Sequence, residues 1–405
     1  MRGEEEEQQG DDADEEIEER KERQHFSAIL RAFAHYPRWA LARVARLEGD
    51  YGRLSARHQT LLDTAGKIAD MRRAVHANAD LLERIVGPHR QHVGAAEEAA
   101  RASNAAENAR TRVLVNRPDG NGTAFVSADR ADYVPESDME KLQSTIKQFV
   151  REWGAEGAPE RECAHRPALD ALRMALPGGA ARGDRVLLPG SGMGRLAWEC
   201  ANLGYTAQGS EFSYFMLLAG NFVLNGLKEL GSIEVHPWVL QTCNVRQRAD
   251  LLRANVVPDV APWSLPDGAN LSMVAGDFLE VYRDQSRCWE AVLTCFFIDT
   301  AHNIAHYIGR IRELLVPGGC WVNMGPLLWH FSDSPNEVSV DLSWDELRLL
   351  IIDAGFTIEH ESWHRAPYVR NVRSMYQMDY DCVCFVARLD GGAQRPPLQP
   401  PPPPQ

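Results

Sequence analysis

One short segment limits the fold of this chain more than any other, because it sets three glycines between an apolar stretch and a helical one. Residues 185–189 read as a strand, and Gly190, Gly192 and Gly194 come directly after it, before a helical pattern over 196–203. Glycine permits a tight turn and lets a ligand approach the backbone, while the helix N-terminus offers free N–H groups. The segment alone is equally consistent with a plain turn, so its meaning depends on the residues C-terminal to it.

Strands and helices alternate regularly in the C-terminal half of the chain. Apolar runs bounded by turn residues predict strands, and apolar residues at three- and four-residue spacing predict helices. The predicted strands cover 185–189, 206–211, 271–277, 290–299, 320–324, 356–360 and 381–387, and the predicted helices cover 196–203, 215–224, 304–315 and 344–354. This order predicts an α/β fold with a doubly wound, mainly parallel sheet and helices on both faces.

The rest of the chain divides by composition. An apolar stripe that begins at Phe26 predicts helices up to Gly87, with a kink or a junction between two helices at Pro37. Ser137 is the predicted N-cap of a further helix. The predicted organisation is a disordered acidic tail (1–23), a helical region (24–87), a linker (88–137), the α/β domain (138–389) and a disordered Pro-rich tail (390–405).

Charge and cysteine usage narrow the function classes. The net charge of −14 argues against a protein that binds phosphate backbones, so no nucleic-acid partner is expected. No run reaches the roughly 18 apolar residues of a membrane span, so no membrane partner is expected. The eight cysteines form no C-x-x-C pair and are expected to be reduced thiols. A soluble protein of the cytoplasm is the expectation, with the nucleus as a second location.

Two positions beyond the glycines indicate which ligand the turn binds. Glu211 ends the next strand, where a carboxylate can accept both hydroxyls of a ribose. Asp277 and Phe278 end the third strand, where methyltransferases place a carboxylate on the adenine amine and a ring beside the base. The Pro-Gly-Gly turn ending at Gly319 and the closing strand pair are also typical of class I methyltransferases. Glu211 suits either ligand, whereas the other three features favour S-adenosylmethionine as the cofactor over a dinucleotide.

Asp299 is the leading candidate for catalysis. It ends the fourth strand, at the edge where open α/β sheets bind ligands, and a carboxylate there could hold a substrate N–H. The alternative is an N-cap for the helix that begins near Ala301. His330 lies in the loop after the fifth strand, on the same edge, although a loop histidine is often only solvated.

A second pair of histidines raises the question of a metal. His302 and His306 are four residues apart on one helix, a spacing that could place both on one ion. No third ligand or general-base glutamate accompanies them in a metalloprotease pattern. We therefore expect surface or capping histidines and no metal site.

Several longer segments resemble the carnosine N-methyltransferase family. They are Gln148–Trp153, Leu188–Tyr205, Gln208–Ser213, Asn221–Asn225, Thr294–Asn303 and Gly325–His330. The resemblance extends upstream to His25 and covers nearly everything but the two tails. It implies a class I, Rossmann-like methyltransferase domain with an N-terminal helical region. It also implies methyl transfer from S-adenosylmethionine to an imidazole nitrogen of carnosine (β-alanyl-histidine), which gives anserine.

The resemblance also implies roles for individual residues. With Gly192 of the glycine turn, the predicted cofactor-binding residues are Gln148, Arg151, Gly190, Glu211, Asp277, Phe278 and Cys295. Arg151 would pair with the methionine carboxylate of the cofactor. The predicted substrate-binding residues are Asp299, His330, Tyr368 and Tyr380, of which the first two are the predicted catalytic residues. The resemblance further implies a homodimer formed through the N-terminal helices, for which the apolar stripe from Phe26 is a suitable surface.

Two other functions remain open. A protein or peptide histidine methyltransferase would have the same pocket chemistry with an open substrate groove. A non-catalytic scaffold that binds S-adenosylmethionine would use its acidic and Pro-rich tails to recruit partners. Asp299 and His330 argue against the scaffold.

Overall fold

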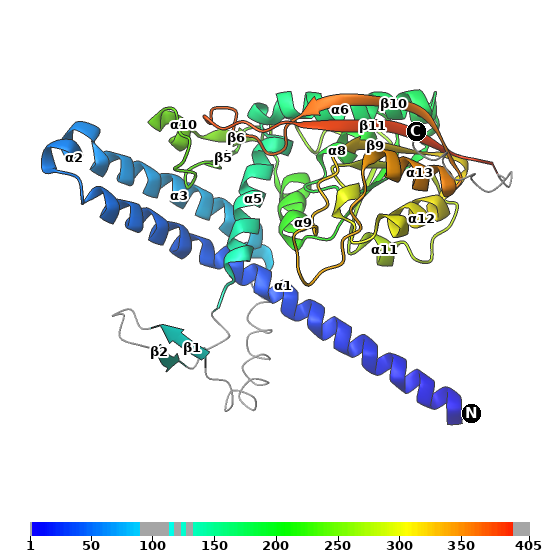
Figure 1. The fold of residues 1–405 in the computed structure, drawn as a ribbon, viewed down its shortest axis with the longest axis horizontal. Helices are drawn as coiled ribbons and strands as arrows, with labels where there is room; N and C mark the ends of the chain where they lie inside the picture. The colour runs from blue at the N-terminus through cyan, green and yellow to red at the C-terminus, as the bar shows by residue number, and fades with distance from the viewer. Residues whose placement is uncertain (1, 90–112, 117–122, 127–132, 392–405) are drawn as a thin grey trace, which may run out of the picture. The chain divides into compact units, whose positions relative to one another are not determined.

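The computed structural model describes residues 2–89, 113–116, 123–126 and 133–391 of the chain (Figure 1). It forms two compact units. The first unit comprises Met1–Ile146, Glu234–Gln241 and Leu251–Ala254, and the second comprises Lys147–Ile233, Thr242–Asp250 and Asn255–Gln405. None of the helices in the described residues is long and apolar enough to cross a membrane.

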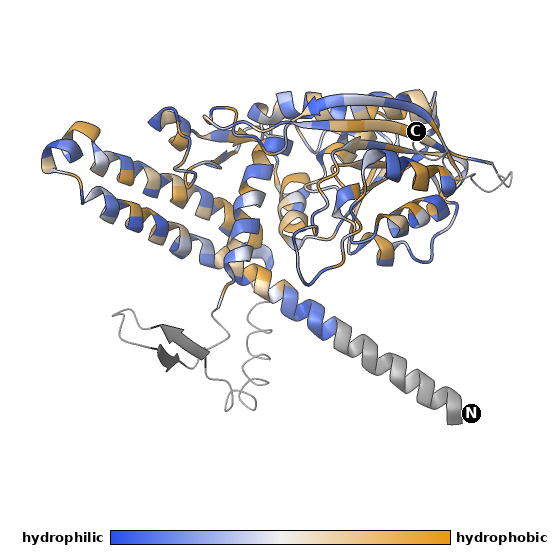
Figure 2. Ribbon diagram, in the orientation of Figure 1, coloured by the Kyte–Doolittle hydropathy of each residue, from blue (hydrophilic) through white to orange (hydrophobic). Residues whose placement is uncertain are grey.

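The first unit is built on a long helical hairpin. Its helices are α1 (Arg2–Tyr51), α2 (Ala56–Leu62), α3 (Thr64–Val86) and the 3-10 turn η1 (Gly87–His89). Hydrophobic and hydrophilic stripes alternate along α1 and α3 (Figure 2), as expected for two helices that each bury one face. A buried amide bridges three parts of this unit: Asn78 donates to the Tyr36 hydroxyl at 3.1 Å and to the His236 carbonyl at 2.9 Å.

The N-terminal predictions need three corrections. Helix α1 extends back to Arg2, although the composition of residues 1–23 predicts disorder; Glu and Gln are good helix formers, and acidic side chains suit a helix N-terminus. Pro37 lies inside α1, so it is no junction between two helices. Helix α5 (Glu136–Trp153) begins one residue before Ser137, the predicted N-cap.

The predicted linker, 88–137, is only partly described. It contains two short strands, β1 (Val113–Asn116) and β2 (Thr123–Val126), which pair antiparallel. The sequence did not predict these strands, because each is only four residues long and turn residues surround them. Most of the remaining linker, and the Pro-rich tail from residue 392, lie outside the described residues.

The second unit contains a seven-stranded sheet in the order β10-β11-β9-β8-β3-β4-β7. Its strands are β3 (Arg185–Pro189), β4 (Thr206–Glu211), β7 (Asn270–Ala275), β8 (Trp289–Cys295), β9 (Leu315–Gly325), β10 (Phe356–Ala366) and β11 (Tyr380–Leu389). All pairs from β9 to β7 are parallel, whereas β11 runs antiparallel to both β9 and β10. The doubly wound sheet with an appended antiparallel pair is therefore confirmed, and the strand order reverses between β3 and β8.

Helices cover both faces of this sheet because its central strands are apolar on both sides. Leu188 packs in one core with Leu172 and Ala197, from α6 (Ala158–Ala175) and α8 (Arg195–Asn202). Its neighbour Leu187 points the other way and packs with Ile311 of α12 (Ile304–Leu314). The remaining elements are η2 (Ala155–Gly157), α7 (Gly179–Arg182), α9 (Tyr214–Asn221), η3 (Phe222–Gly226), β5 (Ile233–Val235), α10 (Arg248–Leu252), β6 (Asn255–Val257), α11 (Phe278–Val281), η4 (Ile298–Thr300) and α13 (Trp344–Asp353).

Candidate active site

A cavity of about 540 Å³ lies in the second unit, along the carboxyl ends of β3, β4, β7 and β8. This is the point where the strand order reverses, and open α/β sheets bind ligands there. The volume suits a small molecule. All eight predicted cofactor-binding residues line the cavity, from segments far apart in the sequence: Gln148, Arg151, Gly190, Gly192, Glu211, Asp277, Phe278 and Cys295.

Two glycines of the turn after β3 cannot be replaced without strain. Gly190 and Gly192 have φ angles of 67° and 56°, in the left-handed region that favours glycine. A Cβ on Gly190 would collide with the ring of Phe297, and one on Gly192 would lie 2.5 Å from a carboxylate oxygen of Glu152. The bare backbone of this turn therefore forms one wall of the cavity.

Glu211 connects the end of β4 to this turn. Its Oε2 accepts a hydrogen bond from the Gly192 amide at 2.8 Å, and its Oε1 accepts one from the Ser213 amide at 2.9 Å. Burial raises the pKa of this carboxyl group, and the amide donors oppose the shift. Two carboxylate oxygens offer about four lone pairs, so acceptor capacity remains for ligand hydroxyls.

Asp277 and Phe278 form the part of the wall beyond β7. Asp277 caps α11, because its Oδ1 accepts from the Leu279 amide at 2.8 Å and from the Glu280 amide at 3.3 Å. Phe278 is buried and meets the Phe297 ring edge-on, at a centroid distance of 5.7 Å. A carboxylate and an aromatic surface therefore lie next to one another at this end of the cavity.

Another part of the cavity wall holds a cation between aromatic and amide groups. The guanidinium carbon of Arg151 lies 4.6 Å from the centroid of the Tyr368 ring, and Arg151 Nη1 donates to Gln148 Oε1 at 3.4 Å. Gln148 Nε2 in turn donates to the Tyr368 hydroxyl at 3.0 Å. The Phe296 ring contacts the Tyr368 ring in a tilted arrangement, at a centroid distance of 5.0 Å. The structure thus joins two predicted cofactor residues to a predicted substrate residue.

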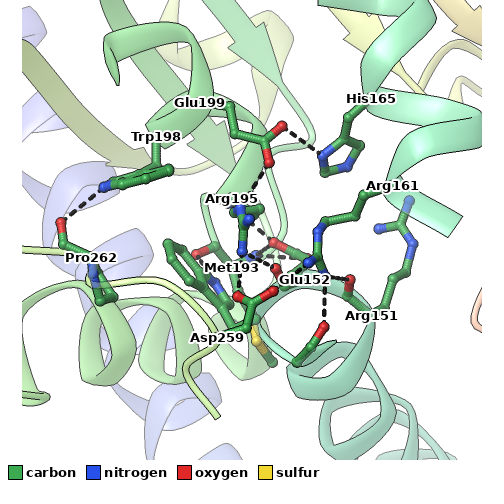
Figure 3. Close-up of polar contacts among 12 residues, drawn as sticks. Arg151, Glu152, Arg161, His165, Met193, Arg195, Trp198, Glu199, Asp259 and Pro262 are labelled. Atoms are coloured by element: carbon green, nitrogen blue, oxygen red, sulfur yellow. Dashed lines mark hydrogen bonds and ion pairs between the residues drawn. The ribbon is translucent and has the colours of Figure 1, made fainter. Parts of the chain in front are cut away.

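Sequence reasoning missed Glu152, which is only 3% exposed (Figure 3). Both of its carboxylate oxygens accept from the Met193 amide at 3.1 Å, and Oε2 also accepts from the Arg195 amide at 3.2 Å. These amides open helix α8, where a negative charge is favourable. Burial raises the pKa of Glu152, while Arg151 and the amide donors lower it. A signal was present: Glu152 follows Gln148 by four residues and shares its helix face.

Behind Glu152 lies a buried group of paired charges (Figure 3). Arg195 donates to Asp259 Oδ1 at 2.8 Å and to Glu199 Oε1 at 2.8 Å. Arg161 also pairs with Asp259, and it donates to the Arg151 carbonyl at 2.7 Å. Buried ions are tolerated when they are paired and hydrogen-bonded, as here. The network fixes the backbone of α5 next to the glycine turn.

The predicted substrate residues divide into two groups. His330 and Tyr368 line the cavity, whereas Asp299 and Tyr380 are not among its lining residues. Asp299 is 2% exposed, and its Oδ2 accepts from the Leu328 amide at 2.9 Å. Its carbonyl accepts from the His330 amide at 3.0 Å. Burial raises the pKa of Asp299, and nearby His330 lowers it.

The N-cap alternative for Asp299 is wrong. Asn303 caps α12, because its side chain accepts from the Ala305 amide at 3.0 Å. Asp299 instead ties the turn η4 to the loop after β9. The prediction that Asp299 ends the fourth strand is also wrong, because β8 ends at Cys295 and Asp299 lies in the short turn η4 that follows it.

His302 and His306 do not share a helix, contrary to the prediction, because His302 precedes α12 and only His306 lies within it. His302 lines the cavity and stacks on Phe331 at a centroid distance of 3.7 Å, and its Nδ1 lies 3.0 Å from the Val338 carbonyl oxygen. His306 is exposed. Within the part of the chain that the structure describes, no three His, Cys, Asp or Glu side chains are grouped so that they could hold a metal ion.

Comparison with known proteins agrees with this geometry. Residues 128–391 match the family described as carnosine N-methyltransferase. The chain is 38% identical over 382 residues to a carnosine N-methyltransferase of Mus musculus, covering 92% of this chain and 88% of that one. It is 39% identical over 382 residues to one of Rattus norvegicus, with the same coverage, and 35% identical over 376 residues to one of Drosophila melanogaster, covering 92% and 81%.

Proposed function

Because the chain belongs to the carnosine N-methyltransferase family, we propose that it methylates an imidazole nitrogen of carnosine or a related histidine-containing dipeptide. It is an S-adenosylmethionine-dependent enzyme, and anserine would be its product from carnosine. The observation that carries the proposal is a single cavity. The eight predicted cofactor residues, His330 and Tyr368 all line it, so donor and acceptor sites would adjoin.

The residues around the cavity fit S-adenosylmethionine. The glycine turn, where Gly190 and Gly192 carry no side chain, would receive the methionine part of the cofactor, with Arg151 facing its carboxylate. Glu211 would accept the ribose hydroxyls, and Asp277 with Phe278 would bind the adenine. Bound there, the cofactor supplies an electrophilic methyl group.

The remaining work of the protein is to orient a nucleophile and exclude water. A free imidazole has a pKa near roughly 6.5, so it is mostly neutral near pH 7 and its lone pair is available without a strong base. Selecting the reacting nitrogen is the harder task. A carboxylate that accepts the N–H of the other nitrogen would fix the tautomer and stabilise the cationic ring that forms.

We assign this carboxylate role to Asp299. The Leu328 amide occupies Oδ2, which leaves Oδ1 for the substrate N–H. Because Asp299 is buried and does not line the cavity, this role requires that its side chain become accessible when the substrate binds. Burial strengthens such a bond, since few water molecules compete for the carboxylate. His330, whose amide is bound to the Asp299 carbonyl, and the two tyrosines, Tyr368 and Tyr380, would hold the remainder of the dipeptide.

The Asp299→Asn variant tests this assignment. We expect kcat with carnosine to fall about 100-fold, as for loss of one charge-stabilising group, while affinity for S-adenosylhomocysteine stays unchanged. Asp284→Asn, at an exposed position, is the control for the same chemical change. Near-normal turnover by Asp299→Asn would rule out the proposed role.

A second candidate substrate is a histidine within a longer peptide. Phe212 and Tyr368 line the cavity yet are 67% and 41% exposed, so apolar surface is available to residues flanking a target histidine. Competition separates the two: carnosine and histidine-containing peptides are supplied together with labelled cofactor. Preferential labelling of the dipeptide supports the proposal, and preferential labelling of peptides supports the alternative.

We also infer a homodimer that works in the cytoplasm, with the nucleus as a second location. The stripe expected to form the dimer surface is largely buried within the chain, since Ile29, Leu30 and Phe33 are 2–3% exposed. Pairing through α1 would therefore use its other face. Light scattering tests the dimer, because one chain has a mass of 45.3 kDa and a dimer has twice that mass. Microscopy of the tagged protein tests the location.

A further inference from the structure

Glu160, near the start of α6, has no assigned role, yet three donors converge on it. It is 7% exposed and lies outside the cavity wall. Its Oε1 accepts from Arg151 Nε at 2.7 Å and from the Val369 amide at 2.8 Å. Its Oε2 accepts from the Arg370 amide at 3.2 Å. One buried carboxylate therefore holds a cavity-lining cation and two consecutive backbone amides.

The two amides belong to a segment, residues 368–370, that we call the strap. Tyr368 is its cavity-lining member. Val369 has a φ angle of 51°, a conformation that a β-branched residue rarely adopts and that surrounding contacts must maintain. Successive amides in such a turn form a natural binding site for an anion. Glu160 supplies that anion from α6, so this helix stabilises the backbone conformation of the strap.

Arg151 links this carboxylate to the cavity. Its Nε is bound to Glu160 and its Nη1 to Gln148, its guanidinium lies over the Tyr368 ring, and Arg151 itself lines the cavity. A ligand carboxylate at Arg151 would act on a cation whose position is already set by Glu160. If Arg151 moves, the strap is therefore expected to move with it, because Arg151 contacts the Tyr368 ring and shares the Glu160 carboxylate with the Val369 and Arg370 amides.

We propose that Glu160 is a positioning residue that couples occupancy of the cofactor site to the conformation of the strap, and thereby to binding of the methyl acceptor. The proposal rests on the proposed function in taking Arg151 as the contact of the cofactor carboxylate. Coupling between two sites is reciprocal, so the methyl acceptor tightens cofactor binding by the same factor.

Hydrogen exchange at the Val369 and Arg370 amides measures the coupling in the full-length protein. In the wild type we expect saturating S-adenosylhomocysteine to slow their exchange at least about fivefold, the lower range of site coupling. In Glu160→Gln the amides should exchange faster without ligand, and the ligand should no longer protect them. Glu162→Gln is the matched control, since this exposed residue lies on the same helix, and it should behave like the wild type.

Kinetics supply a readout that a purely structural role would not move. We expect Glu160→Gln to raise the KM for the methyl acceptor at least about fivefold, with a smaller change in kcat. If the variant is too unstable to assay, Glu160→Asp replaces it: the charge is kept but withdrawn by one methylene, so a partial loss of coupling is expected.

The outcomes separate this proposal from the proposed function. The exchange experiment uses only S-adenosylhomocysteine, so it gives a result whether or not carnosine is the substrate. Protection of the strap by ligand in Glu160→Gln, equal to that in the wild type, overturns the coupling role. Unchanged strap exchange on ligand binding in the wild type overturns it as well.

Discussion

In the proposed function, Glu211 serves both the fold and the ligand. Burial raises its pKa above the ordinary value of 4.5, so this group binds a proton more readily in the folded protein than in the unfolded chain. The contribution of this group to stability is therefore present at low pH and is lost as the pH rises through the raised pKa. Ligand binding has the opposite requirement, since ribose hydroxyls need the carboxylate as an acceptor.

The expected result is that the affinity for S-adenosylhomocysteine falls as the pH drops through this raised pKa, which lies above 4.5. Isothermal titration calorimetry at a series of pH values measures the effect. Glu211→Gln should bind more weakly than the wild type at neutral pH, and the difference should shrink as the pH drops, because the variant lacks this pH dependence. A pH profile that is identical in the variant and the wild type would show that another group is responsible.

Individual residues also mark where sequence reasoning stopped. The positions of Glu211 and Asp277 in the cavity wall were predictable because Glu211 ends β4 and Asp277 lies two residues after β7, at the edge where open α/β sheets bind ligands. Glu152 and Asp259 were not, because their roles depend on contacts with Arg195, 43 and 64 residues away in the chain. The enclosure of Asp299 depends equally on a distant loop. Spacing within one element reveals neither kind of contact.

At the scale of the element, the glycine turn makes a test with a built-in control. Gly192→Ala places a Cβ 2.5 Å from Glu152 Oε1 at a φ angle of 56°, so it should destabilise the protein by about 1–2 kcal/mol and weaken cofactor binding. Gly309→Ala makes the same substitution inside α12, where no atom lies within 4 Å of the added Cβ. That variant should stabilise the helix by about 0.5–1 kcal/mol.

Thermal unfolding with and without S-adenosylhomocysteine measures both variants. The Tm without ligand should fall in Gly192→Ala and rise in Gly309→Ala. The further rise in Tm that the ligand causes should be reduced only in Gly192→Ala. Equal stabilisation of both proteins by the ligand would mean that the turn does not contact it.

Elements were predictable where burial imposes a pattern. The apolar strands β8 and β9 could be recognised because they are enclosed on both faces. Their lengths could not: β9 extends back through the Pro-Gly-Gly turn to Leu315, and pairing with β8 decides that boundary. The π-helical turn η3 continues α9 without a break in the apolar pattern, so periodicity could not detect it.

At the scale of the whole molecule, the sequence indicates the α/β sheet and the cofactor side of the cavity more reliably than the substrate side. The cofactor side is built from strand ends, which recur in fixed order. The substrate side is built from η4, the loop after β9 and the segment between β10 and β11, whose conformations depend on one another. The proposed reaction therefore rests on family membership, and the geometry identifies the residues whose substitution tests it.

The most direct test of the central claim is mass spectrometry of carnosine after incubation with the purified protein and S-adenosylmethionine. The account predicts a single added methyl group, and fragmentation should place it on the imidazole ring rather than on the amine of β-alanine. Free histidine and homocarnosine, incubated in parallel, define how much of the dipeptide is required. Absence of any methylated carnosine, or a methyl group on the amine, would contradict the account.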